Sequence, residues 1–363
     1  MDRPVVAVIL AGGTGSRLYP ASRSHRPKQF LALGEGDDSL LARTAARTGF
    51  ADATLVATRP AFADAVTEHA PDAEVVVEPA GKDTGPAILY ATHRARAAVD
   101  GDPVVVVLPA DHHVPDGDAF ARTMTRGARV AADTDRLVAF GVEPTRPATG
   151  YGYIEPGAER TVATDGAAGE PDDADAAHAA DATYRELAAF HEKPDADTAT
   201  AYVDAGYLWN AGIFAWTPEA LFREARDSPL GPLVDALDRE DPDPEGGFDA
   251  VDPVSVDYAV MERAERAAVV PADFAWDDLG AWDALDRVLD ADADGNAVAE
   301  PAVTLTVDAA DNVVAGDGDT HVSLVGVEDL CVVAYDDRVL VVPKERAQAV
   351  RDAVDALNRR GEF

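Results

Sequence analysis

Short apolar runs rich in valine recur through about the first 110 residues, and they constrain the fold more than any other feature. They occupy residues 5–10 (VVAVIL), 53–58 (ATLVAT), 73–79 (AEVVVEP) and 103–111 (PVVVVLPAD), with alanine-rich stretches of helical composition between them. Strands that are apolar along their whole length are buried on both faces, and parallel strands joined by helices give that arrangement. The sequence therefore predicts an α/β fold with a mixed, mainly parallel sheet covered by helices.

The pattern changes from Leu137 onward, where the runs LVAFGVEP and GYGYIEP are separated by turn residues. This change predicts an insertion into the sheet or an extension of it. The segment from about Ala158 to Thr183 has almost no large apolar residues and many Asp and Ala, which is typical of an exposed, mobile loop at residues 158–183. A helix is expected from about Pro218 to Arg226.

A break near residues 290–296 (DADADGN) divides the chain. Closely spaced strand-like runs follow it (VTLTV, NVVAG, HVSLVG, LCVVAY and RVLVV), and a helix over Glu345 to Asn358 ends the sequence. We therefore expect a large domain at residues 1–290 and a small β-rich domain at residues 297–363. No long repeat is evident within the second domain.

The net charge of −36 is spread along the whole chain, which argues against nucleic acid or an anionic membrane as a partner. Lysine is scarce, arginine is common, and Asp and Ala dominate the loops; this composition is typical of a halophile. There is no charged-then-apolar leader and no apolar run near the roughly 18 residues of a membrane span, so we expect a cytoplasmic protein. The single cysteine, Cys331, excludes an internal disulfide.

A glycine turn directly follows the run at residues 5–10. It lacks the Gly-Lys-Ser/Thr ending of a P-loop, and after Gly13 and Gly15 it lacks the third glycine of a dinucleotide fingerprint. The remaining interpretation is a loop whose backbone N–H groups approach a nucleotide while Arg17 and Lys28 supply positive charge. The expected nucleotide contacts in this loop are Leu10, Ala11, Gly12, Gly13, Gly15 and Ser16.

The stretch LAGGTGSRLYPASRSHRPKQF, residues 10–30, resembles the signature of the sugar-phosphate nucleotidyltransferases. Its PKQF ending resembles the bacterial-type mannose-1-phosphate guanylyltransferases in particular. The resemblance implies a Rossmann-like, glycosyltransferase-A-like nucleotidyltransferase domain followed by a small β-rich domain. It also implies that GTP and mannose 1-phosphate are the substrates and that GDP-mannose and pyrophosphate are the products, and a homodimer is possible.

Asp111 comes directly after an all-apolar strand, and open α/β sheets bind ligands at the carboxyl ends of their strands. The resemblance implies that Asp111 binds both the nucleotide and Mg²⁺. A second metal ligand is implied by FAWDDLGAW, where Asp278 matches the family pattern W-x-D-x-G-x-W. Hard carboxylate and phosphate oxygens suit Mg²⁺.

Further motifs resemble the rest of the family's site. EPAGKDTGPAI resembles the nucleotide-selecting loop and adds Lys82 and Thr84, although Lys82, Asp83 and Gly85 stand where Arg, Asn and Ala are more usual. TGYGYIEP, FHEKPD, YLWNAGIFAW and SVDYAVMER resemble the sugar-phosphate side. The resemblance places there Gly152, Glu192, Lys193, Asn210 and Asp257.

The resemblance implies three catalytic residues: Arg17 and Lys28 neutralise the triphosphate, and Lys193 aligns the attacking sugar phosphate. Two alternatives stay open. One is a nucleotidyltransferase that joins glucose 1-phosphate or N-acetylglucosamine 1-phosphate to UTP or dTTP, and PKQF and LWNAGIF count against it. The other is a non-catalytic regulator that binds nucleotide sugars, and the presence of Asp111, Lys193 and Asp278 counts against it.

Overall fold

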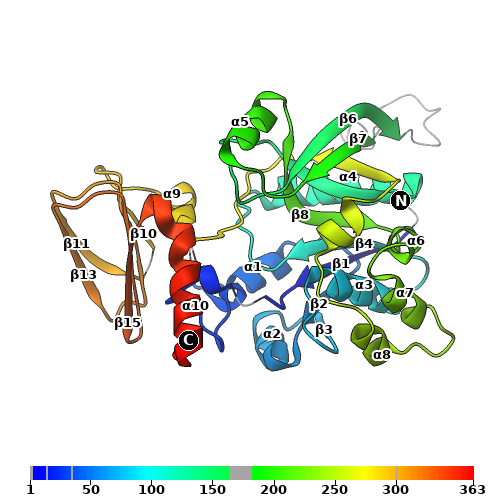
Figure 1. Ribbon diagram of the computed structural model, residues 1–363, viewed down its shortest axis with the longest axis horizontal. Coiled ribbons are helices and arrows are strands. Elements are labelled where there is room, and N and C mark those ends of the chain that lie inside the picture. The colour runs from blue at the N-terminus through cyan, green and yellow to red at the C-terminus, as the bar shows by residue number, and fades with distance from the viewer. Residues whose placement is uncertain (1–2, 14, 34–35, 163–181, 300) are drawn as a thin grey trace.

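The computed structural model describes residues 3–13, 15–33, 36–162, 182–299 and 301–363. Figure 1 shows a large α/β unit and a smaller β unit beside it, with helix α10 (Val350–Arg360) between the two. In the described part of the chain the large sheet has nine strands. In spatial order they are β3 (Glu74–Val77), β2 (Ala53–Thr58), β1 (Val5–Leu10), β4 (Val104–Pro109), β8 (Leu208–Trp216), β5 (Leu137–Val142), β9 (Ala267–Pro271), β7 (Ala182–His191) and β6 (Tyr153–Val162).

The predicted α/β class is confirmed, and the four valine-rich runs form the parallel neighbours β3, β2, β1 and β4. The second half of the sheet follows a different order. Strand β8 lies antiparallel between β4 and β5, so a late segment of the chain separates two strands that are consecutive along it. Sequence pattern predicts that these strands exist, whereas their order depends on pairing between distant segments.

Helices cover both faces of the sheet, each over its own apolar cluster. One face carries α1 (Leu40–Ala46), α2 (Ala63–His69) and α4 (Gly117–Thr134), and the other carries α3 (Thr84–Ala95), α6 (Pro218–Arg226), α7 (Gly231–Leu237) and α8 (Pro244–Asp249). The helix expected at 218–226 is thereby confirmed. The other helical segments are α5 (Ala196–Asp204), α9 (Leu285–Val288), the 3-10 turns Ser16–Leu18, Lys28–Phe30, Pro60–Phe62, Trp282–Ala284 and Lys344–Ala349, and the π-turn Asp257–Met261.

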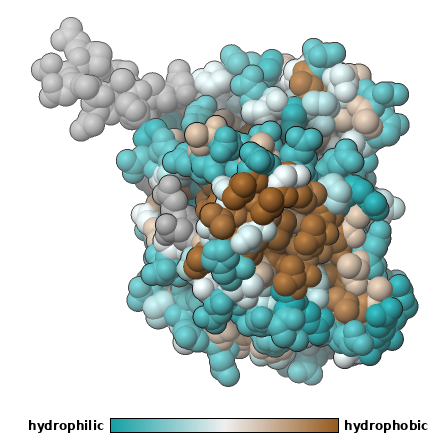
Figure 2. All heavy atoms as spheres, turned by 90° about the vertical axis from the view of Figure 1, so that its left-hand side faces the viewer, coloured by the Kyte–Doolittle hydropathy of each residue, from teal (hydrophilic) through white to brown (hydrophobic). Residues whose placement is uncertain are grey.

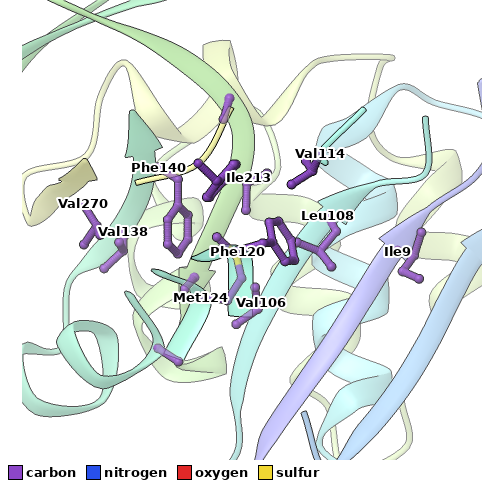
Figure 3. Close-up of a cluster of buried hydrophobic side chains, with 14 of the residues drawn as sticks. Ile9, Val106, Leu108, Val114, Phe120, Met124, Val138, Phe140, Ile213 and Val270 are labelled. Carbon is purple, nitrogen blue, oxygen red and sulfur yellow. The ribbon is translucent and has the colours of Figure 1, made fainter. Parts of the chain in front are cut away.

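Figure 3 shows how α4 packs on the sheet. Phe120 and Met124 lie four residues apart on one side of the helix and are buried among strand residues such as Ile213. Gly127 takes the next position on that side, and a Cβ there would lie 2.2 Å from the ring of Phe140. Each large side chain buried here stabilises the fold by about 1.5–3 kcal/mol.

The loop predicted at residues 158–183 is wrong at both of its ends. Strand β6 continues to Val162 and pairs antiparallel with β7, which begins at Ala182. Cross-strand hydrogen bonding holds these polar residues in a hairpin, and composition alone does not reveal that partner. Residues 163–181 lie outside the described residues.

The C-terminal unit is a short parallel β-helix. Strands β10 (Ala297–Ala299), β12 (Val313–Gly316) and β14 (Leu330–Tyr335) pair parallel to one another, and β11 (Val303–Val307) pairs parallel to β13 (His321–Val325). A final strand, β15 (Arg338–Pro343), runs antiparallel to β14. Alternate strands along the chain are therefore stacked, so the unit does contain a structural repeat that the sequence interpretation missed.

Two fully buried asparagines connect successive turns of the β-helix. Asn312 Nδ2 donates to Asn296 Oδ1 at 2.9 Å, and Asn296 Nδ2 donates to the carbonyl of Ala309 at 2.9 Å. Asn312 Oδ1 also accepts from the backbone N–H of Leu330 at 3.1 Å. Buried amides cost free energy unless they are hydrogen-bonded, so this ladder fixes how the turns are stacked.

The β-helix packs against the segment that follows the glycine loop. Leu18 and Ala21 share one apolar cluster with Trp282 and with residues of β10, β12 and β14. The Trp282 indole N–H donates to the carbonyl of Tyr19 at 2.8 Å, and Arg26 pairs with Asp336 at 3.0 Å. The second unit therefore packs against the segment that follows the glycine loop and stabilises its position.

An apolar surface lies at the far end of the β-helix, which Figure 2 shows as a patch of hydrophobic side chains. Val303, Leu305 and Val307 of β11 are 46%, 52% and 46% exposed, and Val325 of β13 is 64% exposed. The outer strands of the β-helix thus present apolar side chains at the surface. No helix in the described ranges is both long enough and apolar enough to span a bilayer.

We predict that Asn312→Ala lowers the free energy of unfolding by about 3 kcal/mol, because it leaves buried partners of the asparagine ladder without hydrogen bonds. Thermal unfolding followed by circular dichroism measures the effect. Asn358→Ala, at an exposed position of α10, is the control and should leave the midpoint unchanged. Equal midpoints for the two variants would show that the ladder contributes nothing.

Candidate functional site

A cavity of about 480 Å³ lies at the carboxyl ends of the four parallel strands. Its wall includes Gly12 and Gly13 after β1, Arg59 after β2, Glu78 after β3 and Asp111 after β4. Parallel strands end at one edge of the sheet, so residues separated by about 100 positions meet there. The volume suits a small-molecule ligand.

The glycine loop is held by residues of the PKQF motif. Gln29 Nε2 donates to the carbonyls of Ala11 and Gly13 at 2.9 and 3.0 Å. Gly15 has a φ of 58°, and a Cβ there would lie 2.2 Å from Cβ of Lys28. Only glycine fits this position, because the lysine stem crosses the loop directly beside it.

Lys28 is 5% exposed and reaches two segments distant in sequence. Its Nζ donates to Asp111 Oδ2 at 2.9 Å and to the backbone carbonyl of Asp278 at 2.5 Å. Burial by itself would raise the pKa of Asp111, but the ammonium of Lys28 holds that pKa below its ordinary value. The carboxylate of Asp111 is therefore charged at neutral pH.

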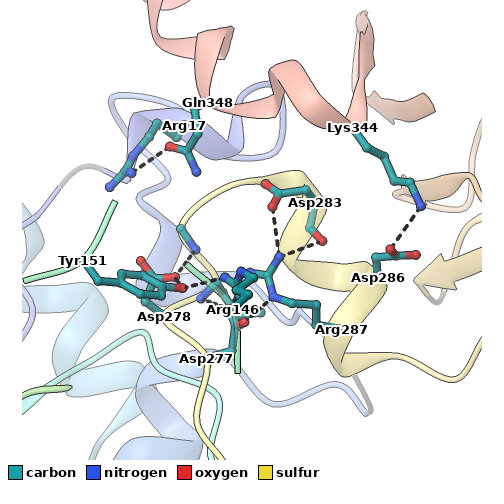
Figure 4. Close-up of polar contacts among 12 residues, drawn as sticks. Arg17, Arg146, Tyr151, Asp277, Asp278, Asp283, Asp286, Arg287, Lys344 and Gln348 are labelled. Atoms are coloured by element: carbon teal, nitrogen blue, oxygen red, sulfur yellow. Dashed lines mark hydrogen bonds and ion pairs between the residues drawn. The ribbon is translucent and has the colours of Figure 1, made fainter. Parts of the chain in front are cut away.

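The two neighbouring aspartates of FAWDDLGAW have different surroundings, as Figure 4 shows. Asp277 is 6% exposed and pairs with Arg287, with Nε 2.7 Å from Oδ2. Asp278 Oδ1 instead accepts from the hydroxyl of Tyr151 at 2.9 Å and from the N–H of Gly280 at 3.0 Å. Burial and Asp278 raise the pKa of Tyr151, so its hydroxyl stays protonated and donates. Asp277 therefore forms a structural ion pair with Arg287.

Asp111 and Asp278 are the carboxylates that the sequence assigns to Mg²⁺, and Lys28 connects their two segments. Both supply hard oxygen donors, which Mg²⁺ prefers, and Mg²⁺ takes few protein ligands when phosphates complete its shell. The donor set therefore fits the ion.

The five residues expected on the sugar-phosphate side do lie together, although they come from four segments of the chain. Asn210 Nδ2 donates to Asp257 Oδ1 at 2.9 Å, and the N–H of Asn210 donates to the carbonyl of Gly152 at 2.9 Å. Lys193 forms an ion pair with Glu192, whose Oε2 would lie 2.8 Å from a Cβ on Gly152. Burial, reinforced by Glu192, raises the pKa of Asp257 to about 6. Asp257 also lines the 480 Å³ cavity, so the cluster adjoins it.

Other expected residues lie elsewhere. Arg17 is exposed and its Nη1 donates to Gln348 Oε1 of the C-terminal unit at 3.0 Å, as seen in Figure 4. Lys82 Nζ donates to the carbonyls of Phe248 and Val251 at 2.7 and 2.9 Å, outside the cavity wall. Their side chains are thus bound to protein groups.

The remaining nucleotide positions differ among themselves. Leu10 and Thr84 line the cavity, whereas Ala11 is buried and its carbonyl accepts from Thr58 at 2.9 Å. Ser16 faces a separate depression beside α10. The structure explains why residue 85 is glycine and not the more usual alanine: a Cβ at this position would lie 2.6 Å from the carbonyl oxygen of Val254.

Sequence reasoning missed Arg59 and Glu78 in the cavity wall. Glu78 is 4% exposed, and burial raises its pKa to about 7 against the opposing charge of Arg59. A Cβ on Gly12 would lie 3.0 Å from Glu78 Oε1, so the glycine leaves space over the carboxyl group. Both residues directly follow parallel strands, and the rule that identified Asp111 would have found them.

These strand-end residues and the glycine loop line one cavity at the edge of the α/β sheet, where Lys28 connects Asp111 with the segment of Asp278. The family model for nucleotidyl transferase matches residues 6–295, and that for the MannoseP isomerase/GMP-like beta-helix domain matches residues 303–357. The chain therefore belongs to the nucleotidyl transferase family.

Similar proteins narrow the class. Mannose-1-phosphate guanylyltransferases of Escherichia coli K12 and Salmonella typhimurium LT2 are each 36% identical over 98% of this chain and 73% of their own length. A crystal structure described as a mannose-1-phosphate geranyltransferase from Thermus thermophilus is 34% identical, covers 98% of this chain and 99% of its own, and has a TM-score of 0.83. The chain belongs to the mannose-1-phosphate guanylyltransferase family.

We expect substitution of Asp277 to affect stability and substitution of Asp278 to affect activity. We predict that Asp277→Asn lowers the free energy of unfolding by about 2 kcal/mol, because it breaks the ion pair with partly exposed Arg287. Asp278→Asn should leave the thermal midpoint unchanged and reduce nucleotidyl transfer by at least about 10². Melting curves and turnover of both variants test this; the reverse assignment of the two effects would contradict it.

Proposed function

We propose that the protein transfers GMP from GTP to α-D-mannose 1-phosphate, giving GDP-mannose and pyrophosphate. The observation that carries the proposal is that Asp257 belongs both to the nucleotide-sized cavity and to the cluster of Asn210, Glu192 and Lys193. Two substrates bound on the two sides of Asp257 would be neighbours. The relatives named above bear the name of this reaction.

The reaction needs little covalent chemistry from the protein. A phosphate oxygen of the sugar phosphate attacks the α-phosphorus of GTP in line, and pyrophosphate leaves. A phosphate monoester is already an anionic nucleophile, so positioning and charge neutralisation suffice. Lys193 would exchange its ion pair with Glu192 for a contact with the attacking phosphate. Lys28 lies on the nucleotide side, beside Asp111.

We assign Mg²⁺ to Asp111 and Asp278, which suit it as oxygen donors. When bound, the ion supplies positive charge to the phosphate oxygens.

Glu78 supports guanine as the base. Guanine presents the donors N1–H and N2–H₂ side by side, and a carboxylate can accept both. Uracil and thymine present one N–H flanked by carbonyl oxygens, which a carboxylate repels. The buried Glu78 in the cavity wall therefore favours GTP over UTP and dTTP.

The test of the proposed function is pyrophosphate release across a grid of nucleoside triphosphates and sugar 1-phosphates, in concentrated KCl and in dilute buffer with Mg²⁺. We expect release with GTP and mannose 1-phosphate above every other pair. Release with a UTP or dTTP pair alone would favour the related nucleotidyltransferase, and no release would favour a nucleotide-sugar-binding regulator.

We predict that Glu78→Gln lowers kcat/KM for GTP about 10- to 100-fold relative to UTP, since an amide offers one acceptor and one donor. The pKa of Glu78 is raised to about 7, so the carboxylate that binds guanine is present above pH 7 and is lost as the pH falls. The KM for GTP should therefore rise more steeply below pH 7 in the wild type than in the variant, by up to about tenfold per pH unit, whereas titration of the substrate phosphates affects both proteins alike. The same pH dependence of KM in both proteins would contradict the role of Glu78.

We also predict that Arg17→Ala or Lys28→Ala lowers turnover by about 10² to 10³, the usual loss for one preorganised charge. Arg17 would exchange Gln348 for the triphosphate when the nucleotide binds. Arg351→Ala, an exposed arginine on α10, is the matched control and should keep the wild-type rate. An unchanged rate in Arg17→Ala would remove Arg17 from the mechanism.

A further inference from the structure

Lys28 already occupies the space between the two segments that carry the candidate metal ligands. Its Nζ is 2.9 Å from Asp111 Oδ2 and 2.5 Å from the carbonyl oxygen of Asp278. The side chain is enclosed, because the residue is 5% exposed and both acceptors of its Nζ belong to other segments of the chain. The ammonium is therefore a fixed positive charge at this place.

Both carboxylates have protein partners in this state. Asp111 has Lys28, and Asp278 accepts from the hydroxyl of Tyr151 and the N–H of Gly280. Arg146 Nη2 lies 3.3 Å from that hydroxyl and adds positive charge behind Asp278. A divalent cation entering now would replace satisfied contacts and would meet the ammonium at short range.

Mg²⁺ binds oxygen at about 2.0–2.1 Å, so an ion on Asp111 would lie close to an ammonium that contacts the same carboxylate. Two positive charges at such a distance repel strongly in a partly buried site. The ammonium of Lys28 and a divalent cation can therefore both bind beside Asp111 only when further anionic oxygens are present. A nucleoside triphosphate brings those oxygens.

We propose that Lys28 is the resident counter-ion of Asp111 in the nucleotide-free enzyme, so that a divalent cation enters the site with the triphosphate and not before it. This inference rests on the proposed function. When the nucleotide binds, phosphate oxygens give the ammonium new acceptors and allow both cations to remain. Lys28 thereby couples metal entry to nucleotide entry.

The test is Mn²⁺ binding to nucleotide-free protein, followed by the paramagnetic signal of free Mn²⁺. We expect Lys28→Met to bind Mn²⁺ at least about tenfold more tightly than the wild type, because Asp111 loses its counter-ion. Lys82→Met is the matched control, since Lys82 Nζ donates to the backbone carbonyls of Phe248 and Val251. It should bind Mn²⁺ as the wild type does.

Two further variants locate the effect and guard against misfolding. Lys28→Gln removes the charge but keeps a polar N–H group at this position, and it should show the same gain as Lys28→Met. Adding Asp111→Asn to either variant should abolish the gain. Circular dichroism confirms that each variant is folded.

Equal Mn²⁺ affinity in folded Lys28→Gln and in the wild type would overturn the counter-ion role, as would an equal gain in Lys82→Met. The measurement uses no substrate, so it is independent of the pyrophosphate grid. If Lys28→Gln gains Mn²⁺ affinity while the wild-type protein releases no pyrophosphate with any substrate pair, the counter-ion role holds and the proposed function fails.

Discussion

The passage of Lys28 beside Gly15 to reach Asp111 is the constraint on which the site depends. It ties together the loop after β1, the end of β4 and the loop that carries Asp278, three segments far apart in the chain. A buried ammonium needs such partners, because an unpaired charge inside a protein is very unfavourable. The same contact keeps the carboxylate charged and ready for ligands that carry cations.

The C-terminal β-helix also holds the segment that follows the glycine loop in place. Its apolar residues share a cluster with Leu18, Ala21 and Trp282, and the indole N–H of Trp282 donates to the carbonyl of Tyr19. Arg17 reaches Gln348 in the same region. The segment that carries the charged residues of the glycine loop is thus shaped from both sides, by the large sheet and by the second unit.

Much of the fold and part of the site could be predicted from sequence, wherever local pattern suffices. The valine-rich runs predicted the parallel strands, and the position of Asp111 after one of them predicted a ligand edge. The same rule, applied to the other strands, would have added Arg59 and Glu78. Tyr151, which donates to Asp278, and Arg146, which donates to Tyr151, were not predictable as neighbours of Asp278, because they come from a loop whose place is set by strand order.

The sequence by itself determined the class of fold, the glycine loop and the residue types that predict a phosphate site, because these depend on short-range spacing and on side-chain chemistry. Tertiary structure decided the insertion of β8, the stacking of the β-helix turns and the separate fates of Asp277 and Asp278. It also decided that Arg17 and Lys82 contact protein groups while Lys28 faces a carboxylate. Such choices depend on contacts between distant segments, and spacing along the chain does not encode them in readable form.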